Sequence, residues 1–102
     1  MKHFIVEIIY TKPFEAVEPV VPDHRAYLQT GYEKGILLMS GPQVPRTGGI
    51  LVARADSANE VLAFCADDPY AVARVASHRV IEFIPKSFQP FLAPWVAEEI
   101  LS

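Results

Sequence analysis

The stretch PDHRAYLQTGYEKGILLMS, residues 22–40, predicts a helix that is followed at once by a strand. Pro22 and Asp23 suit the first turn of a helix. Gly35 can adopt the left-handed backbone conformation that often ends a helix. We therefore expect a helix over residues 22–34 and a strand over residues 36–40. At 100° per residue, the buried face of the helix carries His24, Leu28 and Gly31. His24 thus points inward, at the N-terminal end of that face.

Strands predicted on either side of this stretch supply the rest of a sheet. Residues 3–10, HFIVEIIY, are mostly apolar on both faces and predict an inner strand that is covered on both sides. Residues 50–54, ILVAR, form a hairpin with strand 36–40 across a long turn, and residues 78–85, HRVIEFIP, form a fourth strand. Residues 11–22 contain three prolines and predict a loop with room for a short helical turn.

A second helix is predicted between the third and fourth strands. Residues 57–60, SANE, have the sequence of a capping box, which opens a helix. Pro69 stops that helix. Its inward side carries Ala58, Val61, Leu62 and Cys65. Cys65 is then most simply explained as a packing residue of the core.

The order of these elements, β-α-β-β-α-β, predicts the ferredoxin-like arrangement of the α+β class, a four-stranded antiparallel sheet with both helices on one face. The other face is then bare. Because 51% of the residues are apolar and 21% are charged, one small domain has too little interior for its apolar side chains. We expect a second copy to cover the bare face in a homodimer. The domain spans residues 1–90, and residues 91–102 form a tail with room for a short helix at the dimer interface.

Composition argues against several classes of protein. The net charge is −3 and the basic residues are scattered, so nucleic-acid binding is not expected. The N-terminal residues are charged and alternating, unlike a signal peptide, and no apolar run is long enough to span a bilayer. A single cysteine cannot form an internal disulfide, which favours a cytoplasmic protein. The histidines are too far apart in sequence to indicate a metal site, and we expect no cofactor.

His24 is the first candidate for chemistry. Burial and the positive end of a helix both favour a neutral imidazole that can accept a proton, as a general base does. A buried histidine is nevertheless more often an inert, hydrogen-bonded part of the core. The helical position alone therefore favours the inert interpretation.

Asp68 is the second candidate, and it lies at the predicted end of the second helix, where the helix dipole disfavours acids. The proline that follows holds Asp68 in an extended conformation and so fixes its direction. A carboxylate is a natural partner for a histidine base, because it selects the ring tautomer and stabilises the imidazolium. The sequence leaves open whether Asp68 reaches His24.

The third candidate is the turn GPQVPRTGG, residues 41–49, together with Ser40 before it. Its glycines predict a hairpin loop with positive φ angles, and it lacks the GK[ST] of a phosphate loop. Ser40 and Gly41 end a strand, where the serine hydroxyl can donate a hydrogen bond to a ligand, and Arg46 can meet an anionic group. Taken alone, these residues are more typical of a plain loop.

Other polar and aromatic residues are weaker candidates. His3 and His78 begin edge-like segments, and we expect them at the surface or at an interface. Tyr27 and Tyr32 are more simply explained as walls of a pocket than as acids.

The motifs PDHRAYL, SGP, ADDPY and IEF, in this order and spacing, resemble the YCII-related (YciI-like) family of small proteins. The resemblance covers about residues 1–90. It implies a ferredoxin-like dimeric α+β barrel. It also implies an active site that contains the histidine of the first helix and the aspartate of the Asp-Pro pair, here His24 and Asp68. The family's serine-glycine matches Ser40 and its neighbour, whereas Tyr70 stands where phenylalanine is common.

The resemblance implies less about the reaction. Similar proteins include a dehydrochlorinase that eliminates HCl from chlorinated hydroxyhydroquinones, and related barrel families include lactone isomerases and cofactor-free oxygenases. We predict a cytoplasmic, cofactor-independent lyase or isomerase for a small cyclic or aromatic polar substrate. In this prediction His24 moves the proton and Asp68 orients His24. The substrate is bound by Ser40, Gly41 and Arg46.

Two other functions remain open. The same pocket could bind a small metabolite without changing it. Alternatively, His24 and Asp68 could be a structural pair in a dimeric barrel that has no enzymatic activity. Removing one partner of a buried charged pair lowers the free energy of unfolding by about 3–5 kcal/mol. Residues of a functional site often destabilise the fold, so replacing them lowers its stability little. Unfolding measurements on variants therefore separate a structural pair from a functional one.

Overall fold

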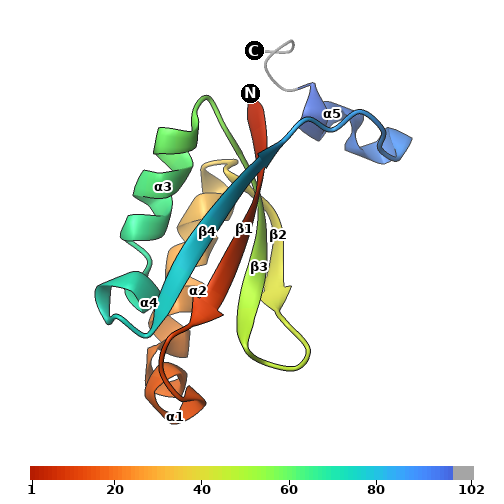
Figure 1. The fold of residues 1–102 in the computed structure, drawn as a ribbon. Coiled ribbons are helices and arrows are strands. Elements are labelled where there is room, and N and C mark those ends of the chain that lie inside the picture. The colour runs from red at the N-terminus through yellow and green to blue at the C-terminus, as the bar shows by residue number, and fades with distance from the viewer. Residues whose placement is uncertain (98–102) are drawn as a thin grey trace.

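The computed structural model describes residues 1–97 and shows a four-stranded antiparallel sheet with helices on one face (Figure 1). In chain order the elements are β1 (Lys2–Tyr10), α1 (Phe14–Val17), η1 (Glu18–Val20), α2 (Val21–Glu33), β2 (Leu37–Pro42), β3 (Gly48–Ala55), α3 (Ala58–Ala66), α4 (Pro69–Val72), β4 (Ala76–Phe83), η2 (Pro90–Leu92) and α5 (Ala93–Val96). The strand order is β2-β3-β1-β4, and each neighbouring pair is antiparallel. The predicted ferredoxin-like α+β fold is confirmed. Within residues 1–97, no helix is long and apolar enough to cross a membrane.

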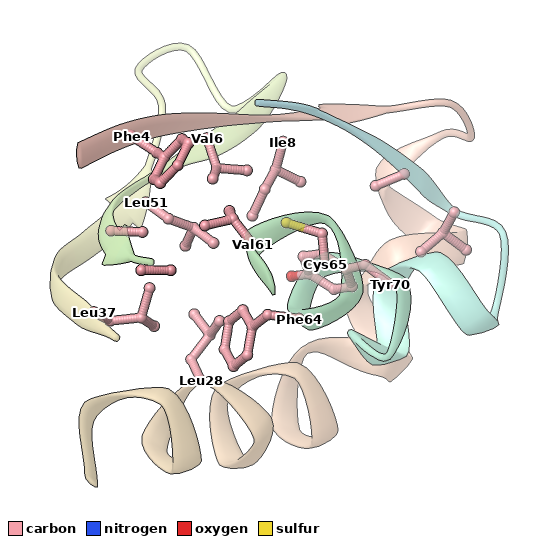
Figure 2. Packing of buried hydrophobic residues seen from close by; sticks show 14 of the residues in the cluster. Phe4, Val6, Ile8, Leu28, Leu37, Leu51, Val61, Phe64, Cys65 and Tyr70 are labelled. Atoms are coloured by element: carbon pink, nitrogen blue, oxygen red, sulfur yellow. The ribbon is translucent and has the colours of Figure 1, made fainter. Parts of the chain in front are cut away.

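The core lies between the sheet and the helices α2, α3 and α4 (Figure 2). Alternation along β1 directs Phe4, Val6 and Ile8 toward the helices, and each is at most 2% exposed. Leu28 of α2 and Val61 of α3 close the core from the other side. The helices therefore bury one apolar stripe each, as the 3.6-residue period requires.

Helix α3 begins as the capping box predicts, because the Ser57 hydroxyl accepts a hydrogen bond from the backbone N–H three residues on, at 3.3 Å. The predicted inward side is wrong at one position: Leu62 is 49% exposed, whereas Phe64 is buried. Phe64 turns inward because its ring stacks on that of Tyr27 in α2, with centroids 4.8 Å apart. Cys65 is a buried packing residue, as predicted.

Several boundaries differ from the prediction: β2 is Leu37–Pro42 and β3 is Gly48–Ala55, where strands over residues 36–40 and 50–54 were expected. Residues 11–22 contain α1 and η1, which run directly into α2, instead of a loop with at most one turn. Each proline in this segment lies at a helix N-cap or in a first turn, where no backbone N–H is needed, so none breaks a helix. Strand β4 begins two residues earlier than expected, because Ala76 already pairs with Tyr10 of β1. The predicted end of α2 is confirmed by Gly35, which has a φ of +75°.

Helices α2, α3 and α4 lie on one face of the sheet (Figure 1). On the second face, the tail helix α5 covers one end, where Trp95 contacts Arg54 and the Val96 backbone bonds to His3. Within residues 1–97, the expectation that β1 is covered on both sides therefore holds for the helix side, and on the second side it holds near His3 but not near Ile9. Several apolar side chains on this open face are 38% to 56% exposed, namely Ile9, Met39, Ile81 and Phe83. We call these residues the open-face cluster.

The described part of the tail docks on its own domain. The Arg54 guanidinium lies 3.8 Å from the centroid of the Trp95 ring, and its Nη1 donates to the Trp95 carbonyl oxygen at 2.9 Å. Its Nε donates to the Gly35 carbonyl oxygen, also at 2.9 Å. The short helix expected in the tail is present as α5. The remaining residues of the tail, 98–102, lie outside the described residues.

Candidate active site

A cavity of about 190 Å³ opens beside α2, the ends of β2 and β3, and the loop between these strands. Its polar lining residues are Tyr10, His24, Arg25, Ser40, Arg46 and Tyr70. An engineered cavity of about 150 Å³ binds benzene, so this volume suits one ring with a few substituents. The sequence singled out four of the residues that line the cavity, namely His24, Ser40, Gly41 and Arg46.

His24 is placed in this wall by the first turn of α2. The residue is 8% exposed, and its Nδ1 lies 2.8 Å from Oδ1 of Asp68. The two residues are 44 positions apart in the sequence, and the fold brings them into hydrogen-bond contact. Because Nδ1 is occupied by Asp68, the other ring nitrogen, Nε2, is the one available to a ligand in the cavity.

Asp68 lies behind His24 and is 1% exposed, and it does not line the cavity. It was expected at the end of a helix, where its charge is poorly placed. Instead it is the N-cap of α4, with ψ at 129°, and its Oδ1 accepts the backbone N–H of Tyr70 at 2.9 Å. The Asp-Pro pair thus begins a helix, because proline is well suited to the first helical position.

A second histidine contacts the same carboxylate. Nε2 of His78 lies 2.8 Å from Oδ2 of Asp68, and the His78 side chain is 6% exposed. The expectation that His78 lies at the surface or at an interface is therefore wrong for its side chain. The register explains the difference: His78 pairs with Ile8, whose side chain faces the helices, so the imidazole points to the same side of the sheet.

The hydrogen bonds decide the charge of Asp68. Burial alone raises the pKa of this carboxyl, but hydrogen bonds from His24, His78 and the Tyr70 backbone N–H outweigh it and lower the pKa to about 2. Asp68 is therefore an anion at neutral pH and can only accept hydrogen bonds. Both histidines must then donate to it, His24 from Nδ1 and His78 from Nε2. This leaves Nε2 of neutral His24 with a free electron pair, as a general base requires.

Aromatic rings and an arginine form the rest of the wall. The ring of Tyr70 stacks on His24, with centroids 3.8 Å apart and planes inclined by 5°. Arg46 donates from Nε to the hydroxyl of Tyr10 at 3.2 Å and lies over the ring of Phe14 at 4.8 Å. Burial, together with nearby Tyr10, raises the pKa of Tyr70 to about 12, so its hydroxyl stays protonated. These contacts hold Arg46 close to the cavity, where it supplies a cationic group, as does Arg25 in the same lining.

The end of β2 supplies another part of the cavity wall, with Ser40 and Gly41. The Ser40 hydroxyl lies 2.6 Å from that of Tyr32, so Tyr32 supports a polar residue of the site as well as forming a wall. A Cβ atom at Gly48 would collide with the carbonyl oxygen of Ile8. Gly48 therefore allows close approach of two strands, whereas the sequence predicted a glycine needed for positive φ. Gly41 has open space where a side chain would lie.

His3 lies away from this site, on the other face of the sheet. It is 6% exposed, so of the two expected positions the surface is wrong, and an interface position stays a prediction. Burial lowers the pKa of His3, although a hydrogen bond with the Val96 backbone acts in the opposite direction. The tail thus buries this histidine.

Local sequence signals missed His78 and Tyr10 as parts of the site, and noted Tyr70 only as a departure from the family pattern. Strand alternation counted from β1 would have placed His78 on the helix side, but only with the strand register in hand. Among residues 1–97, no group of three or more His, Cys, Asp or Glu side chains is arranged to hold a metal ion.

Comparisons with known proteins bear on this arrangement. The model of the YCII-related domain matches residues 1–84. No curated protein matches the chain. Among solved structures, the fold is similar to 5-chloro-2-hydroxyhydroquinone dehydrochlorinase from Burkholderia phenoliruptrix AC1100, in complex with 2,5-dihydroxybenzoquinone. The TM-score is 0.61 and the identity is 21%, over 85% of this chain and 93% of that one. At this identity the likeness shows a shared fold.

Proposed function

The chain belongs to the YCII-related domain family, and we propose that it is a cofactor-independent lyase or isomerase that moves a proton on a small cyclic or aromatic polar substrate. One observation carries the proposal: His24 lines a ring-sized cavity while its Nδ1 is held by a buried, ionised carboxylate. A histidine held in this way has one fixed tautomer and a partner for the positive charge that it gains.

In the proposed reaction, Nε2 of His24 takes a proton from a carbon or hydroxyl of the substrate. The electron pair left behind forms a new double bond in the substrate. In an elimination, that pair expels a leaving group with its bonding electrons; in an isomerisation, the imidazolium returns the proton to another atom. Asp68 stabilises the imidazolium in either case, because its negative charge lies 2.8 Å from Nδ1.

In this proposal, Arg46 and Ser40 of the cavity lining bind the oxygen atoms of the substrate. Arg46 can pair with a phenolate or enolate oxygen, and the Ser40 hydroxyl can donate to a second oxygen. Gly41 leaves the space beside Ser40 open for the substrate. Negative charge that develops on an oxygen during proton transfer is thereby stabilised by fixed donors.

The fold comparison indicates which compounds to test first. A dehydrochlorinase of small hydroxylated rings has the same fold, and its solved complex holds a dihydroxybenzoquinone. A single ring of that size suits a cavity of about 190 Å³. We therefore propose hydroxylated and halogenated quinols, and ring compounds such as lactones, as the starting panel.

We also propose that the protein works in the cytoplasm as a homodimer in which a second copy covers the open-face cluster. Large apolar side chains 38% to 56% exposed on one sheet face are typical of an interface. Sedimentation at micromolar concentration should give the mass of two subunits. Ile81→Glu, which places a charge in the cluster, should give one. A wild-type protein with the mass of a single subunit would contradict the dimer.

The function is tested by turnover of the panel, followed by absorbance, with wild type and His24→Ala. We expect at least one compound to be consumed by the wild type, and His24→Ala to abolish this while remaining folded by circular dichroism. His3→Ala is the matched control, since His3 is a buried histidine on the other face of the sheet. A folded His24→Ala with wild-type turnover ends the proposal, and tight binding without turnover favours a binding module.

A further inference from the structure

We propose that His78 is a positioning residue for the site, which holds the second oxygen of Asp68 and thereby fixes the ring of His24 with Nε2 toward the cavity. The inference rests on the proposed function for its effect on catalysis. Its geometric content stands on three contacts of one carboxylate: 2.8 Å to His24, 2.8 Å to His78 and 2.9 Å to the backbone N–H of Tyr70.

The contacts divide unequally between the two oxygens of Asp68. Oδ1 accepts from both His24 and the Tyr70 backbone, whereas Oδ2 accepts from His78. The donors come from three different elements, α2, α4 and β4. A carboxylate that is bonded on one oxygen only can still turn about its last side-chain bond, which has a broad rotational preference. The bond from His78 removes this freedom, so Oδ1 remains directed at His24.

His78 acts through Asp68 and does not touch a substrate. It is not among the residues that line the cavity, and its side chain is 6% exposed. Its position is set by a strand, since it pairs with Ile8 in the sheet, and strands hold side chains more rigidly than loops do. At metal sites, loss of an outer partner that orients a ligating histidine typically lowers affinity or activity by about 10- to 100-fold, and we expect an effect of that order from the loss of His78.

The donor roles make the inference testable in the free protein. Because ionised Asp68 only accepts hydrogen bonds, wild-type His24 must carry its proton on Nδ1 and wild-type His78 must carry its proton on Nε2. Long-range ¹H–¹⁵N NMR spectra distinguish the two nitrogens of each ring and need no substrate. They therefore test the inference even if no compound is turned over.

The experiment compares wild type, His78→Phe and His78→Gln in these spectra and, once a substrate is known, in steady-state kinetics. In His78→Phe we expect His24 to lose its single tautomer and kcat to fall by about 10- to 100-fold, with KM changed less than threefold. His78→Gln should restore both, because its amide nitrogen can donate from nearly the position of Nε2. His3→Phe, a buried histidine replaced in the same way, should leave the His24 spectrum unchanged.

Two results would overturn the inference. One is a wild-type spectrum in which neutral His78 carries its proton on Nδ1, since it could then not donate to Asp68. The other is a folded His78→Phe in which His24 keeps a single Nδ1–H tautomer. If His78→Phe does not fold, the wild-type and His78→Gln spectra still decide. If the wild type shows the expected tautomers but turns over no compound, the proposed function is contradicted, and the positioning role of His78 is still supported.

Discussion

Replacing Asp68 by asparagine separates the charge of this carboxylate from its hydrogen bonds. The backbone N–H of Tyr70 donates to Oδ1 at 2.9 Å, so the amide NH₂ cannot occupy that position and the amide oxygen must. His24 can then still donate from Nδ1 to that oxygen. The NH₂ group instead faces Nε2 of His78, which must become an acceptor by moving its proton to Nδ1. Asp68→Asn therefore keeps the tautomer of His24, removes the negative charge and reverses the hydrogen bond with His78.

The expected loss of activity follows from that charge. Opposite charges about 4 Å apart interact by about 4 kcal/mol at an effective dielectric constant of about 20. Every 1.4 kcal/mol or so corresponds to a factor of ten, so loss of the anion should lower kcat by about 100- to 1000-fold. The hydrogen bonds remain paired, but the contribution of the anion is lost, so the free energy of unfolding at neutral pH should fall by about 2 kcal/mol. Asp68→Ala leaves three donors without an acceptor and should cost about 3–5 kcal/mol.

The assay combines kcat, urea unfolding and the ¹H–¹⁵N spectrum of Asp68→Asn. We expect a folded protein with greatly reduced kcat, unchanged His24 tautomer and His78 protonated on Nδ1. A kcat within about threefold of wild type would refute the role of the Asp68 charge in stabilising the imidazolium. Loss of most of the stability in this isosteric variant would favour the purely structural pair.

Three further outcomes are expected. The pKa of Asp68 is lowered from 3.8 to about 2, so the anion stabilises the fold by about 2 kcal/mol above about pH 5. That contribution is lost as the pH falls toward 2, and urea unfolding at several pH values should show it in wild type and not in the asparagine variant. Tyr70→Phe keeps the stack on His24 but removes a hydroxyl beside Arg46, so KM should rise several-fold with little change in kcat; an unchanged KM would contradict this. Arg54→Ala removes two hydrogen bonds and the ring contact with Trp95, so it should cost about 3 kcal/mol in urea unfolding and shift the fluorescence of this single tryptophan to the red. Unchanged stability and fluorescence would show that the tail is not held by this residue.

Local patterns were sufficient for most of the fold. The 3.6-residue period placed His24 on the buried side of α2, and the capping box marked the start of α3 at Ser57. Glycine with positive φ marked the end of α2. Pro22 was read correctly as the opening of α2, but Pro13 and Pro19 were misread, because a proline that breaks a helix and one that begins a helix look alike in sequence. Only the position relative to the N-cap separates the two cases.

The site was predictable in its parts but not in its assembly. The residues His24 and Asp68 were identified, yet their contact spans 44 positions and depends on how α4 packs against α2. His78 was misplaced because the face on which a strand residue lies depends on register, and one residue of slip reverses it. Phe64 was missed for a related reason, since its ring partner belongs to another helix.

The most direct test of the central claim is proton exchange at the substrate in D₂O, measured by NMR for wild type and His24→Ala with the panel of hydroxylated rings. If His24 moves a proton, the wild type should catalyse turnover or solvent-deuterium incorporation for at least one ring compound. The rate of His24→Ala should then be at least about a thousandfold lower, although this variant should still bind the same compound. A folded His24→Ala that exchanges or converts the compound as fast as wild type would contradict the account.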